Sequence, residues 1–200
     1  MIMRSITLKD GSVYNFDKMK VMGILNATDN SFFPGSRVGS VENAVNIAMK
    51  MIEDGADILD IGGESTRPGS DPVSEEQEIN RVVPVIEGIR KKNKDALISV
   101  DTYRAKTAEE AIKAGADIIN DISAMTFDDN MSEVAVKYDT PVILMHIKGT
   151  PKDMQKNPHY DDVVGEVRDF FKERIDYAIS KGIKRDKIIL DPGIGFGKNY

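Results

Sequence analysis

The chain has 200 residues, of which 40% are hydrophobic and 30% are charged, and its formal net charge at pH 7 is −6. This composition excludes an intrinsically disordered protein, and the acidic balance disfavours a nucleic-acid-binding surface, which needs a basic face. The absence of cysteine excludes disulfides and thiolate chemistry and agrees with a reducing cytoplasm. No apolar run approaches the roughly 20 residues that a membrane-spanning helix needs. We therefore expect a cytoplasmic protein whose partners include neither nucleic acid nor a membrane.

The predicted elements begin with a β-hairpin over residues 5–16, because Asp-Gly at positions 10 and 11 is a strong turn signal between apolar runs. After it, a short apolar strand, a polar or glycine-rich loop and an amphipathic helix recur along the chain. The predicted strands are Val21–Leu25, Ile58–Ile61, Leu97–Val100, Asp117–Ile119, Val142–Met145 and Ile188–Leu190. The predicted helices are Val41–Glu53, a second that opens with a capping box at Ser74 and continues through Ile86, Tyr103–Ala114, Met131–Tyr138 and Asp162–Lys181.

Alternating strands and helices predict a parallel sheet, either doubly wound or closed into a barrel. Polar residues stand at or just past the end of each predicted strand: Asn26, Asp60, Asp101, Asn120, His146 and Asp191. Helix N-caps are one explanation for them. A doubly wound sheet concentrates its site at one switch point, whereas a barrel collects side chains from all its strand ends. We therefore favour an α/β fold of the (β/α)8 TIM-barrel type. Because no linker or change of composition interrupts the chain, residues 1–200 are expected to form a single domain.

One candidate site is the segment Gly62–Gly69, which reads Gly-Gly-Glu-Ser-Thr-Arg-Pro-Gly after an apolar strand. Glycines let backbone amides approach a ligand closely, and successive amides form an anion-binding concavity. Thr66 adds a hydroxyl donor, and Arg67 adds a planar fork that suits phosphate oxygens. The segment is interpreted as a phosphate or diphosphate loop; an ordinary glycine-rich turn with a surface arginine is the alternative.

A second glycine-rich segment, Asp191–Lys198, follows the last predicted strand. It could also cradle phosphate, but it has neither the Walker nor the Rossmann spacing. Asp191 is the more informative residue, because a carboxylate in an apolar barrel mouth can accept two N–H donors from an amidine-like edge such as that of an aminopyrimidinone. It needs such a partner, since an unpaired buried charge is costly.

Asp101 and Asn120 lie on adjacent predicted strand ends, and a carboxylate beside an amide could read a heterocycle. The alternative for Asp101 is an N-cap of the helix predicted from Tyr103. Apolar walls for a flat ring would come from Ile122, Met145 and Phe196. His146 could be a base, but without a paired carboxylate in the sequence a structural role is favoured.

Several strings, in this order and over essentially the whole chain, resemble bacterial dihydropteroate synthase, a TIM-barrel enzyme of the folate pathway. They are Met22–Asn26 (MGILN), Gly62–Gly69 (GGESTRPG), Ser99–Tyr103 (SVDTY), Ile119–Ile122 (INDI), Leu144–His146 (LMH) and Asp191–Lys198 (DPGIGFGK). The resemblance implies a transferase in which 4-aminobenzoate displaces diphosphate from a dihydropterin-methyl diphosphate. It also implies Mg²⁺ as a cofactor and a homodimer for the complete protein.

The resemblance assigns roles to the matching positions. Asp101, Asn120 and Asp191 would read the pterin edge, and its ring would contact Ile122, Met145 and Phe196. Asn26 would hold diphosphate together with Mg²⁺. Thr66, Arg67 and Pro68 would lie on a mobile loop over diphosphate and aminobenzoate. Arg67, Asp101 and Asn120 are the expected catalytic residues.

The chain departs from the family pattern in two places. The first loop usually reads Asn-x-Thr-Pro-Asp-Ser-Phe, whereas residues 26–32 lack the proline and have Asn30 in place of the acid. The family also has two further βα units, with a Lys-x-Ser and an Arg-x-His element, that this chain does not include. We therefore expect about six βα units plus the hairpin, and we do not expect full activity from these residues alone.

Two other functions remain open at this point. A pterin-binding methyltransferase barrel shares the pterin readers, but Arg67 favours the synthase, because a methyl carrier has no diphosphate to hold. The other alternative is a non-catalytic fragment that binds a pterin or an anion.

Overall fold

The structure, a computed structural model, describes residues 5–27, 37–65 and 72–198, with the backbone alone described for residues 37–40. The predicted hairpin is confirmed, as strands β1 (Ser5–Thr7) and β2 (Val13–Asn15) pair antiparallel. The other strands are β3 (Met22–Asn26), β4 (Ile58–Gly62), β5 (Leu97–Asp101), β6 (Ile118–Asp121), β7 (Val142–Met145) and β8 (Ile188–Asp191). The helices are α1 (Arg37–Glu53), α2 (Glu75–Lys92), α3 (Ala105–Ala114), α4 (Met131–Lys137) and α5 (Val163–Ser180).

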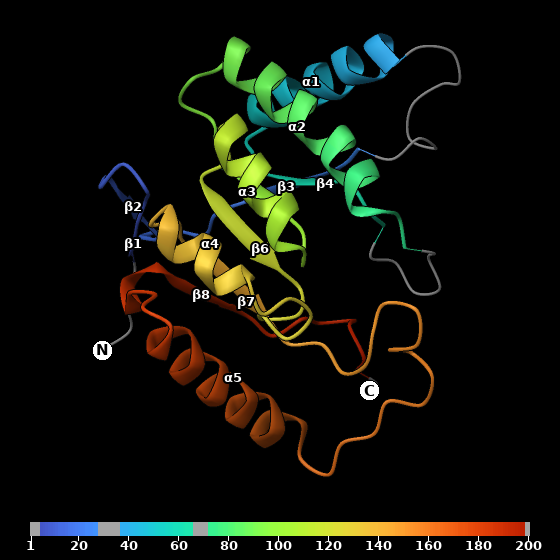
Figure 1. The fold of residues 1–200 in the computed structure, drawn as a ribbon, viewed down its shortest axis with the longest axis vertical. Coiled ribbons are helices and arrows are strands. Elements are labelled where there is room, and N and C mark those ends of the chain that lie inside the picture. The colour runs from blue at the N-terminus through green and yellow to red at the C-terminus, as the bar shows by residue number, and fades with distance from the viewer. Residues whose placement is uncertain (1–4, 28–36, 66–71, 199–200) are drawn as a thin grey trace.

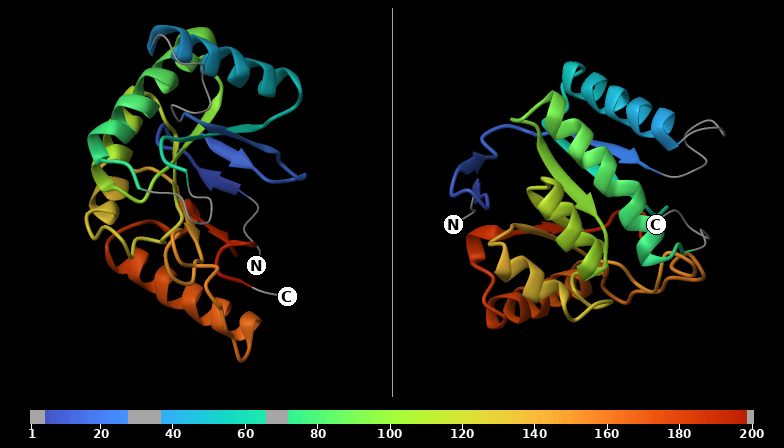
Figure 2. Two further views of the ribbon diagram at one scale, coloured as in Figure 1. Left: turned by 90° about the vertical axis from the view of Figure 1, so that its right-hand side faces the viewer. Right: turned by 45° about the horizontal axis from the view of Figure 1, so that its top comes forward.

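These strands form one 6-stranded parallel sheet in the order β3-β4-β5-β6-β7-β8. The helices lie on the outer side of this curved sheet, as Figures 1 and 2 show. Sequential order, parallel pairing and outer helices are the features of a (β/α)8 barrel, here seen as six of its strands with β3 and β8 at the edges. Among the described helices, none has the length and hydropathy needed to cross a membrane.

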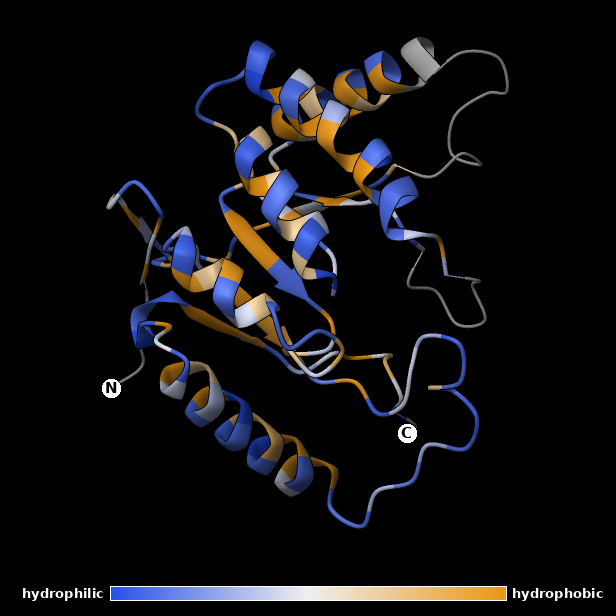
Figure 3. Ribbon diagram, in the orientation of Figure 1, coloured by the Kyte–Doolittle hydropathy of each residue, from blue (hydrophilic) through white to orange (hydrophobic). Residues whose placement is uncertain are grey.

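The largest differences from the predicted boundaries are in two helices, since α1 begins at Arg37 instead of Val41 and α2 continues past Ile86 to Lys92. The differences at the strand ends are smaller but concern the site. Polar or glycine residues that were expected to follow strands instead close them: Asn26 is the last residue of β3, Gly62 of β4, Asp101 of β5 and Asp191 of β8. Their backbones stay in the hydrogen-bonded ladder, so the sheet fixes where these side chains point. Figure 3 shows the same pattern, since the strand in the centre of the view is hydrophobic along its length and hydrophilic at its head.

Alternate residues of each strand serve two different layers, because side chains of a strand point to opposite faces in turn. The outward residues pack under the helices; they include Leu25, Leu59, Ile61, Ile98 and Val100 beneath α1 and α2, and Ile119, Val142 and Leu144 beneath α3 to α5. The inward residues at the strand starts are apolar: Met22, Ile58, Leu97, Ile118, Ile143 and Ile189. Further along the same inward face come Asp60, Ser99, Asn120, Met145 and Asp191, and then Asn26 and Asp101.

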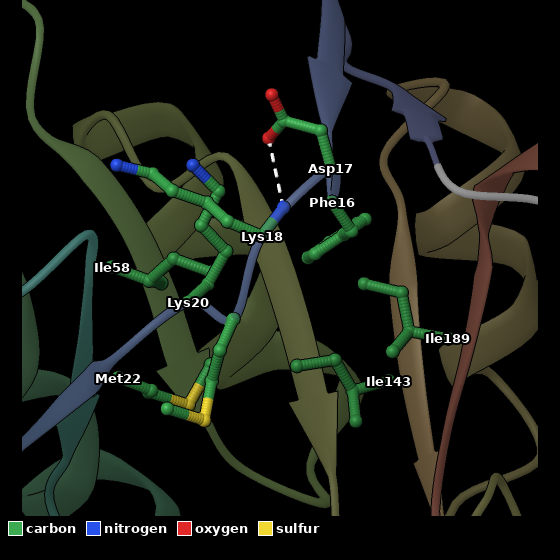
Figure 4. A pocket seen from close by; sticks show the side chains of 9 residues that line it. Phe16, Asp17, Lys18, Lys20, Met22, Ile58, Ile143 and Ile189 are labelled. Carbon is green, nitrogen blue, oxygen red and sulfur yellow. Dashed lines mark hydrogen bonds between the residues drawn. The ribbon is translucent and has the colours of Figure 1, made fainter.

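The starts of the strands enclose a cavity of about 580 Å³. Met22 of β3 and Ile189 of β8, the two edge strands, both line it, together with the segment from Phe16 to Lys20. Figure 4 shows that the side chains from the strands, such as Ile58, Ile143 and Ile189, are apolar, and that Lys18 and Lys20 come from the segment before β3. The strand residues that line it are all apolar, whereas the polar residues of the strands lie at the opposite end.

Candidate active site

A buried carboxylate, Asp60 of β4, links two neighbouring strands inside the barrel. Its Oδ1 atom accepts a hydrogen bond from Ser99 Oγ at 2.5 Å, and its Oδ2 atom accepts one from Asn120 Nδ2 at 3.0 Å. The side chain is 3% exposed. Burial raises the pKa of Asp60, the two donors oppose that rise, and the negative charge of Asp191 adds to it.

Asp101 lies beside this group, in register with Gly62 on one side and Asn120 on the other. A Cβ atom added to Gly62 would lie 3.3 Å from Asp101 Oδ2 and 3.7 Å from Asn26 Oδ1, so the absence of a side chain there leaves the space between these two groups open. Burial first, and then the charges of Asp60 and other nearby acids, hold the pKa of Asp101 well above its usual range.

Two oxygen atoms of this group are buried without a hydrogen-bond partner among the described residues: Asp101 Oδ1 and Asn120 Oδ1. Buried polar atoms are nearly always paired, and an orphan needs an explanation. Both atoms are acceptors and lie on adjacent strands that face the barrel interior. The arrangement therefore suits a ligand that presents neighbouring N–H groups.

The structure excludes the N-cap alternative for Asp101. Helix α3 begins at Ala105, its N-cap is Arg104, and no side chain of that residue caps it. The backbone N–H of Ala105 donates instead to Asp128 at 2.8 Å, and that of Arg104 donates to Thr102 Oγ1 at 3.1 Å. Asp101 therefore does not cap helix α3.

The glycine-rich loop 191–198 presents its carbonyl groups inward, which differs from a phosphate cradle. Lys198 Nζ donates to the carbonyl oxygens of His146, Gly193 and Phe196 at 3.1, 2.9 and 3.1 Å. Gly193 has φ +62°, and an added Cβ there would collide with the carbonyl of His146. The glycines allow the loop to close around an ammonium group, so the geometry gives no support to anion binding by this segment.

Asp191 stands at the base of the same loop, where its Oδ1 atom accepts the backbone N–H of Gly193 at 2.8 Å. It is in register with Met145, which is buried, as is Ile122. Phe196 lies half-buried in the loop. The strand ends thus bring the predicted acceptors Asp101, Asn120 and Asp191 to one end of the barrel.

His146 is packed among aromatic rings, as a structural role predicts. Its ring lies 4.8 Å from that of Phe170 in an edge-to-face arrangement and 6.2 Å from that of Tyr160. Burial lowers the pKa of His146, and the charge of Lys198 adds to this. No carboxylate is hydrogen-bonded to its ring among the described residues, and its Nδ1 atom is buried without a partner there.

Sequence reasoning missed a network that we call the Glu64–Arg104 network. Arg104 donates to Glu78 Oε2 and to Glu64 Oε2, each at 2.8 Å, and the Tyr103 hydroxyl donates to Glu64 Oε1 at 2.7 Å. Both glutamates are buried. The backbone N–H of Val73 also donates to Glu64 Oε2 at 3.0 Å. The network therefore ties residues on both sides of the segment 66–71 to the end of β5.

Three predicted residues, Thr66, Arg67 and Pro68, lie outside the described residues. For a metal ion the described part of the chain offers Asn26 Oδ1 at the barrel mouth, and it contains no group of three or more His, Cys, Asp or Glu side chains that could hold one. An amide oxygen suits Mg²⁺, which keeps several waters and binds through one or two protein oxygens together with substrate phosphates. Asn26 fits such a site.

The fold and this arrangement of acceptors agree with what comparisons with known proteins find. A family model described as "Pterin binding enzyme" matches residues 22–200, and the chain belongs to this family of pterin-binding enzymes. Relatives named dihydropteroate synthase come from Synechocystis, 47% identical over 178 residues, and from Escherichia coli, 46% identical over 189 residues. These alignments cover 89% and 94% of this chain but 61% and 66% of the two relatives, so the chain spans less than two thirds of their length.

Solved structures give the same result for the fold. The Yersinia pestis dihydropteroate synthase in a sulfonamide drug complex matches with a TM-score of 0.89 and 42% identity, over 98% of this chain and 70% of that one. The Xanthomonas albilineans dihydropteroate synthase with 4-aminobenzoic acid matches with a TM-score of 0.88 and 41% identity, over 98% and 68%. The predicted TIM-barrel fold is confirmed.

Proposed function

We propose that the protein is a dihydropteroate synthase, which joins 4-aminobenzoate to (7,8-dihydropterin-6-yl)methyl diphosphate and releases dihydropteroate and diphosphate. The observation that carries this proposal is the pair of buried, unpartnered acceptors Asp101 Oδ1 and Asn120 Oδ1 at the barrel mouth. The similarity to dihydropteroate synthases over about nine tenths of this chain supports it.

The acceptor group accounts for recognition of the pterin. A 2-aminopyrimidin-4-one presents its amino group and a ring N–H on one edge, and Asp101, Asn120 and Asp191 supply oxygen atoms for such donors. Binding would satisfy acceptors that are costly to leave unpaired. Apolar contacts for the ring would come from Ile122, which directly follows β6, from Met145 of β7 and from Phe196 of the loop; the first two are buried.

The diphosphate would lie on the other side of the mouth. Asn26 would hold it together with Mg²⁺, and Thr66, Arg67 and Pro68 would cover it and the aminobenzoate. When bound, Mg²⁺ would supply positive charge to the diphosphate oxygens. Arg67 would add a bidentate donor to the same oxygens and stabilise the charge that develops on the leaving group.

The reaction needs little acid–base help from the protein. The amine nitrogen of 4-aminobenzoate forms a bond to the methylene carbon, the bond from that carbon to the diphosphate oxygen breaks, and the amine loses one proton. Asp101 and Asn120 would hold the electron-rich ring that stabilises positive charge on the methylene carbon. Their catalytic task is therefore to orient the pterin and support that charge.

The test is a measurement of diphosphate release by the complete protein, with each substrate alone and with both. Release that requires both the pterin diphosphate and 4-aminobenzoate supports the proposal, whereas methyl transfer without diphosphate contradicts it. Arg67→Ala serves as an internal check, because loss of its charge should lower kcat far more than the affinity for 7,8-dihydropteroate. Equal losses would place Arg67 away from the diphosphate.

We extend the proposal to the setting of the protein. The absence of cysteine agrees with work in the reducing cytoplasm, and the complete protein is proposed to be a homodimer. Light scattering coupled to size-exclusion chromatography tests the dimer directly, since a monomeric mass at micromolar concentration would contradict it.

A further inference from the structure

Asp60 is not one of the three acceptors proposed to bind the pterin edge, which are Asp101, Asn120 and Asp191, yet its position is chemically unusual. It interrupts the apolar run of β4 between Leu59 and Ile61, and it is buried inside the barrel. No salt bridge compensates its charge among the described residues; its partners are the neutral donors Ser99 Oγ and Asn120 Nδ2. A buried carboxylate without a cation is costly, so a functional reason for Asp60 is to be sought in what it does to these donors.

The side chain of Asn120 can present either its amide nitrogen or its carbonyl oxygen to a neighbour. An ionised Asp60 accepts hydrogen bonds and donates none, so it selects the nitrogen of Asn120, as the 3.0 Å contact shows. The carbonyl oxygen then points away from Asp60, and this Oδ1 atom has no partner among the described residues. Asp60 thus determines that Asn120 offers an acceptor to the barrel mouth.

The opposite orientation would close the site. Asn120 is in register with Asp101 on the adjacent strand, and both side chains face the barrel interior. Adjacent strands lie about 4.8 Å apart, so an amide that turned its nitrogen toward Asp101 could donate to the unpartnered Asp101 Oδ1. Such an internal hydrogen bond would remove both free acceptors at once.

We propose that Asp60 is a positioning residue: by accepting from Asn120 Nδ2 it holds Asn120 Oδ1 and Asp101 Oδ1 side by side as acceptors for two neighbouring N–H groups of the pterin. This inference rests on the proposed function. Asp60 acts through Asn120 and does not itself touch the ligand. The specificity of the site for a ligand edge that carries N–H donors therefore depends on Asp60, which lies behind the residues that contact that edge.

Reversal of the Asp60–Asn120 pair gives the sharpest test. In Asp60→Asn/Asn120→Asp the new amide can donate to one oxygen of the new carboxylate, whose other oxygen still faces the mouth as an acceptor. We expect the affinity for 7,8-dihydropteroate, measured by calorimetry, to return to within about threefold of the unmodified protein. Asn120→Asp alone places two carboxylates against each other and should weaken binding at least tenfold.

Single variants separate positioning from packing. Asp60→Leu removes the acceptor but fills the space, and it should weaken binding at least tenfold. Ser99→Ala is the matched control, because it removes the other hydrogen bond of Asp60 and leaves the one to Asn120 intact. It should change the affinity less than threefold. Thermal unfolding of each variant verifies that a folded protein is being measured.

A second readout needs no ligand. The side-chain amide protons of Asn120, assigned in a nitrogen–proton correlation spectrum by their absence in Asn120→Asp, should shift in Asp60→Leu and stay in place in Ser99→Ala. An unmoved resonance in Asp60→Leu would overturn the inference, as would a reversed pair that binds no better than Asn120→Asp. These measurements use the complete protein. If its unmodified form fails to bind 7,8-dihydropteroate, the proposed function fails; if it binds and Asp60→Leu binds equally well, the inference alone fails.

Discussion

Two groups of buried acids lie within the same barrel end, and they are satisfied in different ways. Glu64 and Glu78 share the guanidinium of Arg104, which donates to each at 2.8 Å. Asp60 and Asp101 have no salt-bridge partner among the described residues, and one oxygen of Asp101 has no hydrogen bond there. The first group is closed by hydrogen bonds to a shared cation, whereas the second has no cation among the described residues and is open toward the barrel mouth.

The contrast indicates which group maintains the fold and which binds. Paired charges need nothing further, so the Glu64–Arg104 network is suited to fastening segments of chain together. Unpaired acceptors make the empty site less stable than it could be, and a ligand with N–H donors relieves that cost. Substitutions in the two groups should therefore have opposite effects on stability and on binding.

The largest effect is expected where the closed group is broken. Arg104→Met leaves Glu64 and Glu78 buried without a cation, which should lower the free energy of unfolding by about 3 kcal/mol, as measured by urea denaturation. The control is Lys50→Met, since Lys50 forms its ion pairs at the surface and should show no measurable change. A neutral effect of Arg104→Met would mean that the ion pairs of Arg104 do not stabilise the fold.

Asp101→Asn, a change in the open group, should weaken ligand binding without lowering stability. Removing an uncompensated buried charge should leave stability unchanged or raise it by up to about 1 kcal/mol. The same change replaces one acceptor oxygen by a donor, and affinity for 7,8-dihydropteroate should fall roughly 100-fold. Calorimetry and urea denaturation on one preparation measure both quantities. A variant that is destabilised but binds normally would assign Asp101 to the closed group.

Acid should titrate the open group first. Burial and neighbouring acids raise the pKa of Asp101, so its carboxylate becomes protonated at a pH where an exposed aspartate is still ionised. Ligand affinity should therefore fall about tenfold per pH unit below that raised pKa. The stability contribution has the opposite sign: it is fully present below the unfolded pKa, near 3.8, and is lost as pH rises through the folded value. Affinity measured from pH 8 to pH 5 in unmodified protein and Asp101→Asn tests this, because the variant should lack the transition.

How much of this comparison could be predicted from sequence depends on distance along the chain. The strand and helix units followed from local periodicity, and the acceptors Asp101, Asn120 and Asp191 from their places at strand ends. The bond from Asn120 to Asp60 spans 60 residues, and the bonds from Arg104 to Glu78 and Glu64 span 26 and 40. No local pattern encodes such pairs. The signal that was available for Asp60 is its charge within an otherwise apolar strand.

The loop 191–198 teaches a related lesson about backbone direction. Its glycine content is equally compatible with amides that bind an anion and with carbonyls that surround a cation, because composition does not record which group points inward. The structure decides for carbonyls around Lys198. Lys198 is thus a cation for the carbonyl groups around it, whereas Asp60 and Asp101 have no cation partner among the described residues.

The smallest predicted effect concerns this loop. Lys198→Met removes the donor shared by three carbonyl groups. The backbone amides of residues 193–198 should therefore exchange faster with solvent. The affinity for 7,8-dihydropteroate should fall about threefold, because Asp191 and Phe196 are less well held. Burial lowers the pKa of Lys198 to about 8, and the charge of Asp191 opposes this shift. Above that pH the loop of the unmodified protein should show the same faster exchange, after correction for the intrinsic exchange rates. Lys181→Met, a change in an exposed lysine at the end of α5, should alter neither quantity. Unchanged exchange in Lys198→Met would mean that the glycines and the side chains around the loop fix its shape without the ammonium group.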